Sequence, residues 1–327
     1  MSRILVVGAT SWGVTLAALL AERGHDVTVA VRHTVEADAL RGLRELERLP
    51  GVSLPASVNV EATDSLTGAF DGVVVATPAQ AVRQALVGLP NWPRPAVLSV
   101  AKGLEAGTNE RMSEVIAARW PGAIISVLSG PNLSHEIAKG APTAAVVASA
   151  DPGAAQFWQQ AVSGGTFRAY TSGDVIGVEL AGALKNVVAI AAGVAWGLGF
   201  GANTVAAIMT RGLAEISRLG IALGAEASTF QGLAGIGDLS ATCFSPLSRN
   251  RQLGELLATG YSITEAQRSI GQAVEGRATA PVAVVLARRA HVEMPIAEHV
   301  TALLEGSESV IEAMGALLER PLTAEGQ

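Results

Sequence analysis

Cysteine is the scarcest residue in this sequence, and histidine is also uncommon. Its 327 residues include one cysteine and five histidines. The single cysteine, Cys243, cannot form a disulfide within the chain, and no Cys-x-x-Cys pair or Cys/His cluster indicates zinc, so we expect no metal site and a reducing, cytoplasmic location. No low-complexity tract is present and 49% of the residues are hydrophobic, which predicts a globular chain rather than a disordered one or a solenoid.

Positive charge and long apolar runs are also lacking. The formal net charge of −6 and the isoelectric point near 5.5 argue against a surface made to hold nucleic acid. The longest apolar run, residues 187–200, falls short of the roughly 20 residues that a membrane-spanning helix needs, and Lys185 and Asn186 precede it. We expect this run to be a buried helix and expect no integral membrane segment. The N-terminus reaches a glycine turn too soon to provide a signal peptide.

The apolar segments change character along the chain. At roughly 150 residues per domain, the length predicts two domains. The first half alternates helix-like segments with short apolar runs, which predicts a Rossmann-like, doubly wound α/β domain over residues 1–178; its strands are expected at 3–9, 25–32, 72–78, 96–103, 123–131 and 143–149. The second half predicts an all-helical domain over residues 179–327, with helices at 203–223, 228–234, 249–259, 263–271, 279–290 and 296–304.

The stretch "GATSWG" at residues 8–13 is an incomplete dinucleotide fingerprint. Gly8 and Gly13 occupy the first and last glycine positions of G-x-G-x-x-G, but Thr10 stands where the backbone approaches the diphosphate. Its side chain could crowd that group, or its hydroxyl could bind it. The motif alone also fits an ordinary strand-turn-helix junction. The preceding strand and the following βαβ pattern favour a nucleotide site at the helix N-terminus.

The end of the second predicted strand indicates which dinucleotide is preferred. A carboxylate there binds the ribose hydroxyls of NAD, but this chain has Arg32 followed by His33. A guanidinium suits the additional phosphate of NADP, so we expect NADPH to be favoured, with NAD use also open. A solvated arginine at a strand end is the alternative interpretation.

Lys185 interrupts an apolar helical pattern, where an unpaired ammonium is costly. Reduction of a carbonyl by a nicotinamide needs a proton donor at the oxygen, and a lysine whose pKa is lowered by burial can serve. Asp238 could orient this lysine or bind a substrate hydroxyl. The structural alternatives are a lysine that extends to solvent or pairs with a carboxylate, and an aspartate that caps the glycine turn before it.

A second polar group, "SRN", suits a phosphate. Arg249 can donate two hydrogen bonds as a fork, while Ser248 and Asn250 fill the remaining oxygen lone pairs. Lys102, at the end of a predicted strand, could add a second positive charge. The same triplet could equally begin a helix, with Ser248 as its N-cap.

Together these stretches resemble the soluble NAD(P)-dependent glycerol-3-phosphate dehydrogenases along essentially the whole chain. The matching stretches, in order, are "GATSWGVTLA", "VVVATP", "SVAKGLE", "SGPNLSHEIAKGAPTA", "ELAGALKNVVAIAAG", "GLAGIGDLSATCFSPLSRNRQLG", "AVEGRAT", "EMPI" and "LLERPL". The resemblance implies reversible conversion of dihydroxyacetone phosphate and sn-glycerol 3-phosphate with NADP or NAD, a supply of glycerol phosphate to glycerophospholipid synthesis, and a cytoplasmic homodimer.

The resemblance also implies roles for individual residues. Lys185 corresponds to the proton donor and acceptor, and we expect Asp238 to act with it. The implied substrate contacts are Lys102, Gly130, Asn132, Lys185, Asp238, Ser248, Arg249 and Asn250. The implied cofactor contacts are Gly8, Thr10, Ser11, Trp12, Gly13, Arg32, His33, Lys102, Ser134, Arg249, Val274 and Glu275.

The chain departs from the family pattern at two of these places. Thr10 replaces the usual second glycine, which bears on cofactor affinity. "GPNLSHE" replaces the commoner "GPSFAxE", which bears on the contacts expected of Asn132 and Ser134.

Two other functions are weighed against this one. Two-domain dehydrogenases of the 3-hydroxyacid or ketopantoate type also join a Rossmann domain to helices and use a lysine, but the cations and hydroxyl at Lys102 and in "SRN" favour a phosphate ester. A non-catalytic NADP sensor would not need Lys185 or Asp238, and both are present.

Overall fold

A sheet of eight strands forms the centre of the N-terminal lobe in the computed structural model, which describes residues 1–92 and 95–318. Residues 319–327, the end of the expected second domain, lie outside this description. The strand order is β3-β2-β1-β4-β5-β6-β7-β8, and its first six members follow the Rossmann order. Neighbouring strands are parallel except for β6 and β7. The predicted doubly wound α/β fold is therefore confirmed.

All six predicted strands are present, and two more lie at the edges of the sheet. The strands are β1 Arg3–Val7, β2 Asp26–Val31, β3 Asn59–Ala62, β4 Gly72–Val75, β5 Ala96–Ser99, β6 Ile124–Ser129, β7 Thr143–Ser149 and β8 Phe167–Ser172. Sequence analysis missed β3 and β8. Both have a neighbour on one side only and carry exposed polar residues, so neither forms the apolar run typical of a central strand.

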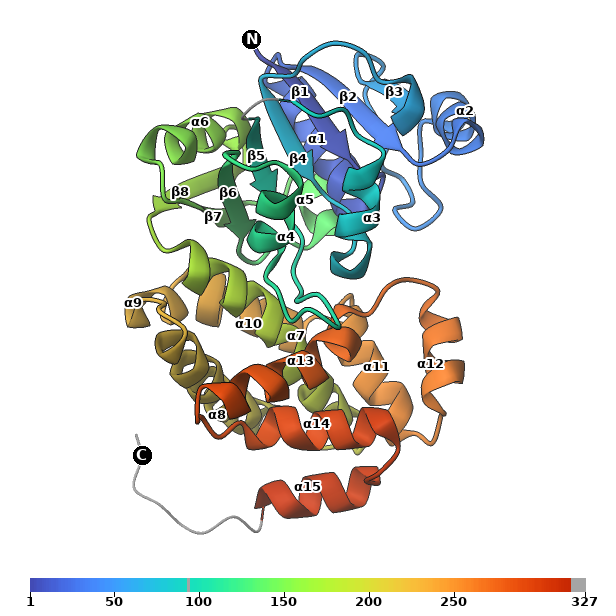
Figure 1. Ribbon diagram of the computed structural model, residues 1–327. Helices are drawn as coiled ribbons and strands as arrows, with labels where there is room; N and C mark the ends of the chain where they lie inside the picture. The colour runs from blue at the N-terminus through green and yellow to red at the C-terminus, as the bar shows by residue number, and fades with distance from the viewer. Residues whose placement is uncertain (93–94, 319–327) are drawn as a thin grey trace.

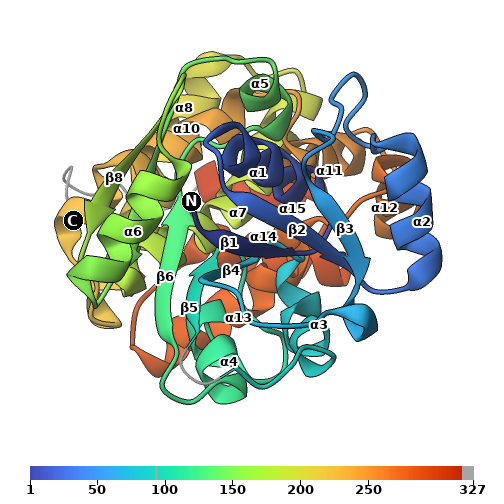
Figure 2. The same cartoon turned by 90° about the horizontal axis from the view of Figure 1, so that it is seen from above.

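Helices cover both faces of the sheet because successive side chains of each strand point to opposite sides. Ile4 and Val6 of β1 belong to one core cluster, and Leu5 and Val7 belong to another. Figure 2 shows α1 on one side of the strands and α3 and α4 on the other. The helices of this lobe are α1 Ser11–Glu22, α2 Thr34–Leu43, α3 Val82–Val87, α4 Met112–Arg119, α5 Ser134–Ala138 and α6 Pro152–Val162, with short turns at Thr63–Ser65 and Ala79–Ala81.

The C-terminal lobe is built of helices, as predicted, and lies below the sheet lobe in Figure 1. Its helices are α7 Val175–Gly197, α8 Ala202–Ala222, α9 Ala227–Phe230, a π-helical turn Leu233–Gly237, α10 Asp238–Phe244, α11 Arg249–Ala258, α12 Ile263–Ile270, α13 Glu275–Arg289, α14 Pro295–Glu305 and α15 Val310–Leu318. The expected helix 228–234 is divided between α9 and the π-helical turn, and the helix expected at 279–290 already begins at Glu275.

Helix α7 is the core of the C-terminal lobe. The apolar run 187–200 marks only part of it, because the helix begins at Val175 and ends at Gly197. By length and composition alone α7 is apolar enough to cross a membrane, but 89% of its most apolar window is buried inside the protein. The expected buried helix is therefore present, and it is longer than its apolar run.

Glycine brings α7 and α11 into direct backbone contact. A Cβ atom on Gly193 of α7 would lie 2.0 Å from the carbonyl oxygen of Arg251, and one on Gly254 of α11 would lie 2.1 Å from that of Ile190. No larger residue fits either position without moving a helix. This crossing fixes the start of α11 relative to the middle of α7.

We predict that Gly254→Ala lowers the free energy of unfolding by about 2–3 kcal/mol, because the added methyl group must push α11 away from α7. Chemical denaturation measures the loss. Gly42→Ala is the matched control: Gly42 lies in α2 with open space at its Cβ position, so we expect no loss and a gain of up to about 1 kcal/mol. Equal effects of the two substitutions would contradict the proposed close contact.

Candidate active site

The carboxyl edge of the sheet faces the helical lobe. Thr10 follows β1, Lys102 follows β5 and Gly130 follows β6, so three predicted site residues lie at the edge where open α/β sheets bind ligands. The segment after β5 continues into the other lobe, as Figure 1 shows, and its Leu104 is fully buried in the core of the helical lobe. Side chains of α7, α10, α11 and α13 meet this edge.

Asp238 lies between two lysines from different lobes. The Lys185 ammonium of α7 donates to Oδ1 of Asp238, and the Lys102 ammonium donates to Oδ2 at 2.6 Å. The Asp238 side chain is 2% exposed, that of Lys185 is 8% exposed and that of Lys102 is 16% exposed. The structure thus brings together both predicted catalytic residues and one predicted substrate contact. Asp238 binds the lysines rather than capping the glycine turn.

Each lysine also donates to a second protein oxygen and has one ammonium hydrogen left over. Lys185 also donates to the Thr242 hydroxyl at 2.6 Å, and that hydroxyl donates to the Asp238 carbonyl oxygen at 2.6 Å. Lys102 also donates to the Gly130 carbonyl oxygen at 2.8 Å. An ammonium has three hydrogens and two are used on each lysine, so one remains on each for a ligand oxygen.

Burial and charge act in opposite directions on this cluster. Burial lowers the pKa of Lys185 to about 8; the Asp238 carboxylate opposes this shift and the Lys102 charge adds to it. Burial by itself raises the pKa of Asp238, but the two ammonium groups hold that pKa below its ordinary value. Asp238 is therefore a carboxylate, and Lys185 is an acid that loses its proton more readily than an ordinary lysine.

Two asparagines connect this cluster to α11 and α13. Asn186 donates from Nδ2 to the carbonyl oxygen of Lys102 at 3.0 Å and accepts from Nδ2 of Asn250 at 2.8 Å. Oδ1 of Asn250 accepts from the Gly276 amide at 2.9 Å. The predicted substrate contact Asn250 is thus engaged with protein at both ends of its amide, with one N–H remaining. Asn186 was not among the predicted site residues.

The start of α11 combines a helix cap with an arginine. Ser248 is the N-cap of α11, and its hydroxyl accepts from the Arg251 amide at 3.3 Å, as the structural alternative predicts. Arg249 is the first residue of the helix. Protein packed around its guanidinium lowers its pKa; the Glu275 carboxylate opposes this shift, and the charge of Arg48 adds to it.

The predicted cofactor residues Val274 and Glu275 begin α13. Val274 is buried at the N-cap position, and Glu275 is the first helical residue. Oε1 of Glu275 accepts from the Ala79 amide after β4 at 3.0 Å, while burial raises the pKa of Glu275. The start of α13 is thereby tied to the carboxyl edge of the sheet.

The loop at residues 8–13 keeps glycine where the backbone requires it. Gly8 has a φ of 106°, and a Cβ atom on Gly13 would lie 2.2 Å from the Gly8 carbonyl oxygen. Thr10 is extended, with a φ of −74°, and its hydroxyl donates to Ala76 O at 2.8 Å and accepts from Gly13 N at 3.0 Å. The hydroxyl therefore caps α1. The first two amides of the helix, those of Ser11 and Trp12, remain for an anion.

The other predicted cofactor and substrate contacts differ in their surroundings. Arg32 and His33 are exposed after β2, and within residues 1–92 and 95–318 neither side chain has a hydrogen-bond or ion-pair partner. Both polar atoms of the Asn132 amide are buried without a partner in the same part of the chain. Ser134 is the first residue of α5, and no hydrogen bond joins its side chain to the lysine cluster in the described chain.

Sequence analysis missed Thr242 and Ser129 as well as Asn186. Thr242 lies four residues after Asp238 on α10, and this helical spacing could have indicated it. Ser129 ends β6, and its hydroxyl donates to Oδ2 of Asp238 at 3.4 Å. Nothing in its sequence context distinguishes it from other small strand residues.

Cys243, next to Thr242, is buried, and burial raises the pKa of its thiol to about 12. Among the described residues, no group of three or more His, Cys, Asp or Glu side chains is placed to hold a metal ion.

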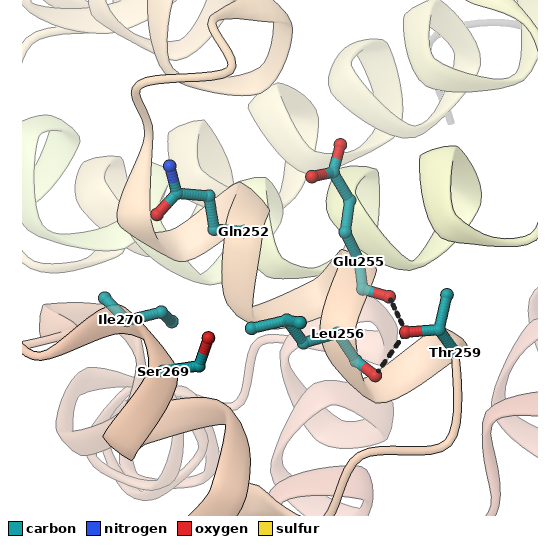
Figure 3. Close-up of a pocket in the computed structure, with 6 residues that line it drawn as sticks. All are labelled: Gln252, Glu255, Leu256, Thr259, Ser269 and Ile270. Atoms are coloured by element: carbon teal, nitrogen blue, oxygen red, sulfur yellow. Dashed lines mark hydrogen bonds between the residues drawn. The ribbon is translucent and has the colours of Figure 1, made fainter.

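A hollow of about 320 Å³ between α11 and α12 lies apart from these residues. Figure 3 shows its lining, which consists of Gln252, Glu255, Leu256, Thr259, Ser269 and Ile270. The Thr259 hydroxyl donates to the carbonyl oxygens of Glu255 and Leu256 and so caps the end of α11. None of the predicted site residues lines this hollow.

Comparison with known families decides which of the expected families the chain matches. The model described as "NAD-dependent glycerol-3-phosphate dehydrogenase N-terminus" matches residues 3–155, and the corresponding C-terminus model matches residues 174–315. The chain belongs to the NAD-dependent glycerol-3-phosphate dehydrogenase family. The family resemblance stated from the sequence is thus confirmed.

Relatives within this family match over full length. A glycerol-3-phosphate dehydrogenase [NAD(P)+] from Rhodopseudomonas palustris is 43% identical over 99% of both chains, and one from Nocardia farcinica is 47% identical over 99% of this chain and all of that protein. The solved glycerol-3-phosphate dehydrogenase from Coxiella burnetii has a TM-score of 0.92 at 34% identity, covering 98% of this chain and 99% of that one. D-mandelate dehydrogenase with NADH is 13% identical with a TM-score of 0.61, covering 93% of this chain and 98% of that one, and shows the fold alone.

We predict that Asp238→Asn lowers the free energy of unfolding by about 3–5 kcal/mol at pH 6, because the buried ammonium of Lys185 and the half-buried ammonium of Lys102 lose their shared carboxylate. The loss should be smaller at pH 9. Without the carboxylate the pKa of Lys185 falls further below its unfolded value, so raising the pH removes the unfavourable charge. Denaturant titrations at both pH values measure the difference. The same loss at pH 6 and pH 9 would contradict this assignment of charge.

Proposed function

We propose that this protein catalyses the reversible reduction of dihydroxyacetone phosphate to sn-glycerol 3-phosphate with NADPH or NADH. The observation that carries the proposal is the buried Lys185–Asp238–Lys102 cluster at the carboxyl edge of a Rossmann-type sheet. The full-length match to enzymes named glycerol-3-phosphate dehydrogenase [NAD(P)+] supports the substrate. Other two-domain dehydrogenases share the fold, but no feature of this site favours an unphosphorylated hydroxyacid.

The chain's residues fit a dinucleotide at the start of α1. Gly8 and Gly13 permit the tight turn, and the Thr10 side chain is directed into the helix cap rather than left free to crowd a diphosphate. The Ser11 and Trp12 amides bind the diphosphate, and Glu275 with Val274 contacts the cofactor from the helical lobe. His33 and Ser134 are retained as cofactor contacts in this proposal.

Lys185 supplies the proton. When bound, the reduced nicotinamide supplies the hydride to the carbonyl carbon of the substrate. Lys185 donates the remaining hydrogen of its ammonium to the carbonyl oxygen, where negative charge develops, and its pKa near 8 makes this transfer easier than from an ordinary lysine. Asp238 holds the ammonium in place through Oδ1 and remains a carboxylate, and it takes no proton itself.

The substrate phosphate is bound by groups from both lobes. Arg249 and Lys102 supply positive charge, while Ser248, Asn250 and Asn132 supply polar contacts, and the Gly130 backbone lies beside them. The buried, unpartnered amide of Asn132 supports this role, because such a group is costly unless a ligand satisfies it. A phosphate monoester carries the charge that this set of cations requires.

The test of the proposed function is an NADPH-oxidation assay. The purified protein should oxidise NADPH with dihydroxyacetone phosphate and only negligibly with unphosphorylated dihydroxyacetone. The assay is repeated with NADH to rank the cofactors. Comparable rates with both ketones would reject the substrate, and the absence of any oxidation would favour a cofactor-binding sensor.

We predict that Lys185→Met lowers kcat for dihydroxyacetone phosphate reduction at least about a hundredfold, since it removes the proton donor. NADPH binding should survive, because Lys185 contacts the substrate. Steady-state assays and a fluorescence titration of NADPH measure the two effects. Retained turnover would remove Lys185 from the mechanism.

The pKa of Lys185 sets the pH dependence of ketone reduction and of the reverse oxidation. We predict that kcat for ketone reduction falls as the pH rises through about 8, because reduction needs the ammonium form. Oxidation of sn-glycerol 3-phosphate needs the neutral amine and should become faster over the same range. Parallel pH profiles in the two directions would argue against a single lysine acting as both acid and base.

Arg32 is proposed to favour NADPH through the additional phosphate. We predict that Arg32→Asp weakens NADPH binding by at least about tenfold, because a carboxylate repels the additional phosphate. NADH binding should change little, because the carboxylate can accept hydrogen bonds from the ribose hydroxyls. Dissociation constants of both cofactors measure the split. An equal effect on both would make Arg32 an ordinary surface charge.

We further propose that the nucleotide domain ends and the helical domain begins near residue 178, with the two covering residues 1–178 and 179–327. The gap between β8 and α7, residues 173–174, supports a boundary close to that position.

The proposal also includes the protein's assembly and role: a cytoplasmic homodimer that supplies sn-glycerol 3-phosphate to glycerophospholipid synthesis. Light scattering of the purified protein tests the dimer.

A further inference from the structure

Arg48 is a cation that the proposed site does not use, and it stands on an anchored loop between α2 and β3. Glu45 and Ser53 form an isolated antiparallel bridge, and the Ser53 hydroxyl donates to the Glu45 carboxylate at 2.7 Å. Leu49 and Leu54 of the same loop are each 2% exposed in the core of the sheet lobe. The backbone on both sides of Arg48 is therefore held in place, while its own side chain is exposed.

The Arg48 guanidinium lies over the loop that follows β1. It donates a hydrogen bond to the carbonyl oxygen of Ala9, and the Ser11 hydroxyl approaches the Arg48 carbonyl oxygen at 3.5 Å. Ala9 and Ser11 flank Thr10, the cap of α1. The guanidinium is thus beside the end of α1 that carries the unpaired Ser11 and Trp12 amides. A guanidinium has five N–H groups, so most of its donors remain after the bond to Ala9.

A second guanidinium, that of Arg249 in the helical lobe, lies within electrostatic range of Arg48. Arg48 and Arg249 are close enough for each charge to act on the other, and their repulsion adds to the burial that lowers the pKa of Arg249. Within residues 1–92 and 95–318 no carboxylate forms an ion pair with Arg48. Arg249 has the Glu275 carboxylate as a counter-charge, but Arg48 has no such partner among the described residues, so its free charge beside a helix N-terminus favours an anion there.

We propose that Arg48 is a cofactor-binding residue that holds the dinucleotide diphosphate against the N-terminus of α1. The inference rests on the proposed function and adds a contact to it. The Ser11 and Trp12 amides would hold the diphosphate, and Arg48 would add a charged donor to it from the anchored loop. Both NADPH and NADH carry the diphosphate, so the Arg48 contact serves both cofactors. The proposed Arg32 contact involves the additional phosphate, which only NADPH carries.

The experiment compares dissociation constants of NADPH and NADH for the wild-type protein, Arg48→Ala and Arg48→Gln, by fluorescence titration. Both variants should bind both cofactors about tenfold more weakly, by nearly the same factor, because one charge-assisted contact to the diphosphate is lost. Arg48→Gln keeps an amide donor for Ala9, so a loss in this variant reports the missing charge rather than a disturbed loop. The KM for dihydroxyacetone phosphate should stay unchanged.

Arg289→Ala is the matched control. Arg289 is exposed at the far end of α13, about 20 Å along the helix from Glu275, so its removal changes the net charge equally without touching the site. The proposal is overturned if the Arg48 variants bind both cofactors as tightly as this control does. It is also overturned if only NADPH binding is weakened, or if only the KM for dihydroxyacetone phosphate rises. Failure of the wild-type protein to bind either cofactor would instead reject the proposed function.

Discussion

The carboxylate of Asp238 between the ammonium groups of Lys102 and Lys185 is the interaction on which the site depends. The buried charge of Lys185 and the half-buried charge of Lys102 exceed the single negative charge of Asp238. Such an arrangement is costly in the free protein and becomes favourable when an anionic ligand or a developing alkoxide arrives. It also joins the lobes, since Lys102 follows a strand of the sheet whereas Lys185 and Asp238 belong to helices of the C-terminal lobe.

Contacts in the surrounding structure fix the relative positions of these three side chains. Close backbone contact at Gly193 and Gly254 fixes α11 against α7, and the asparagine pair Asn186 and Asn250 extends that contact to the loop carrying Lys102. These interactions use backbone and amide groups, which do not titrate. The contacts that position α7, α11 and the loop carrying Lys102 therefore do not depend on pH, whereas the charge of Lys185 does.

The sequence predicted the fold and the reacting groups because both leave strong local signals. Central strands are continuous apolar runs, and Lys185 is conspicuous in an apolar helix. Edge strands β3 and β8 lack that signal, because solvent replaces one neighbour. Side-chain direction was also beyond the sequence: the Thr10 hydroxyl could have faced a ligand but caps α1, and the position of Arg48 depends on a loop with no regular pattern. Partners far apart along the chain, such as Ser129 and Asp238, become neighbours only through the fold.

Leu104 joins the sheet lobe to the helical lobe. The segment after β5 is embedded in the core of the helical lobe, and α7 packs against β6 and β7, so the two lobes share buried surface on this side. Separation of the lobes there would expose buried hydrocarbon to water, which is unfavourable. This buried hydrocarbon therefore holds the lobes together on the side that carries Lys102 and Lys185.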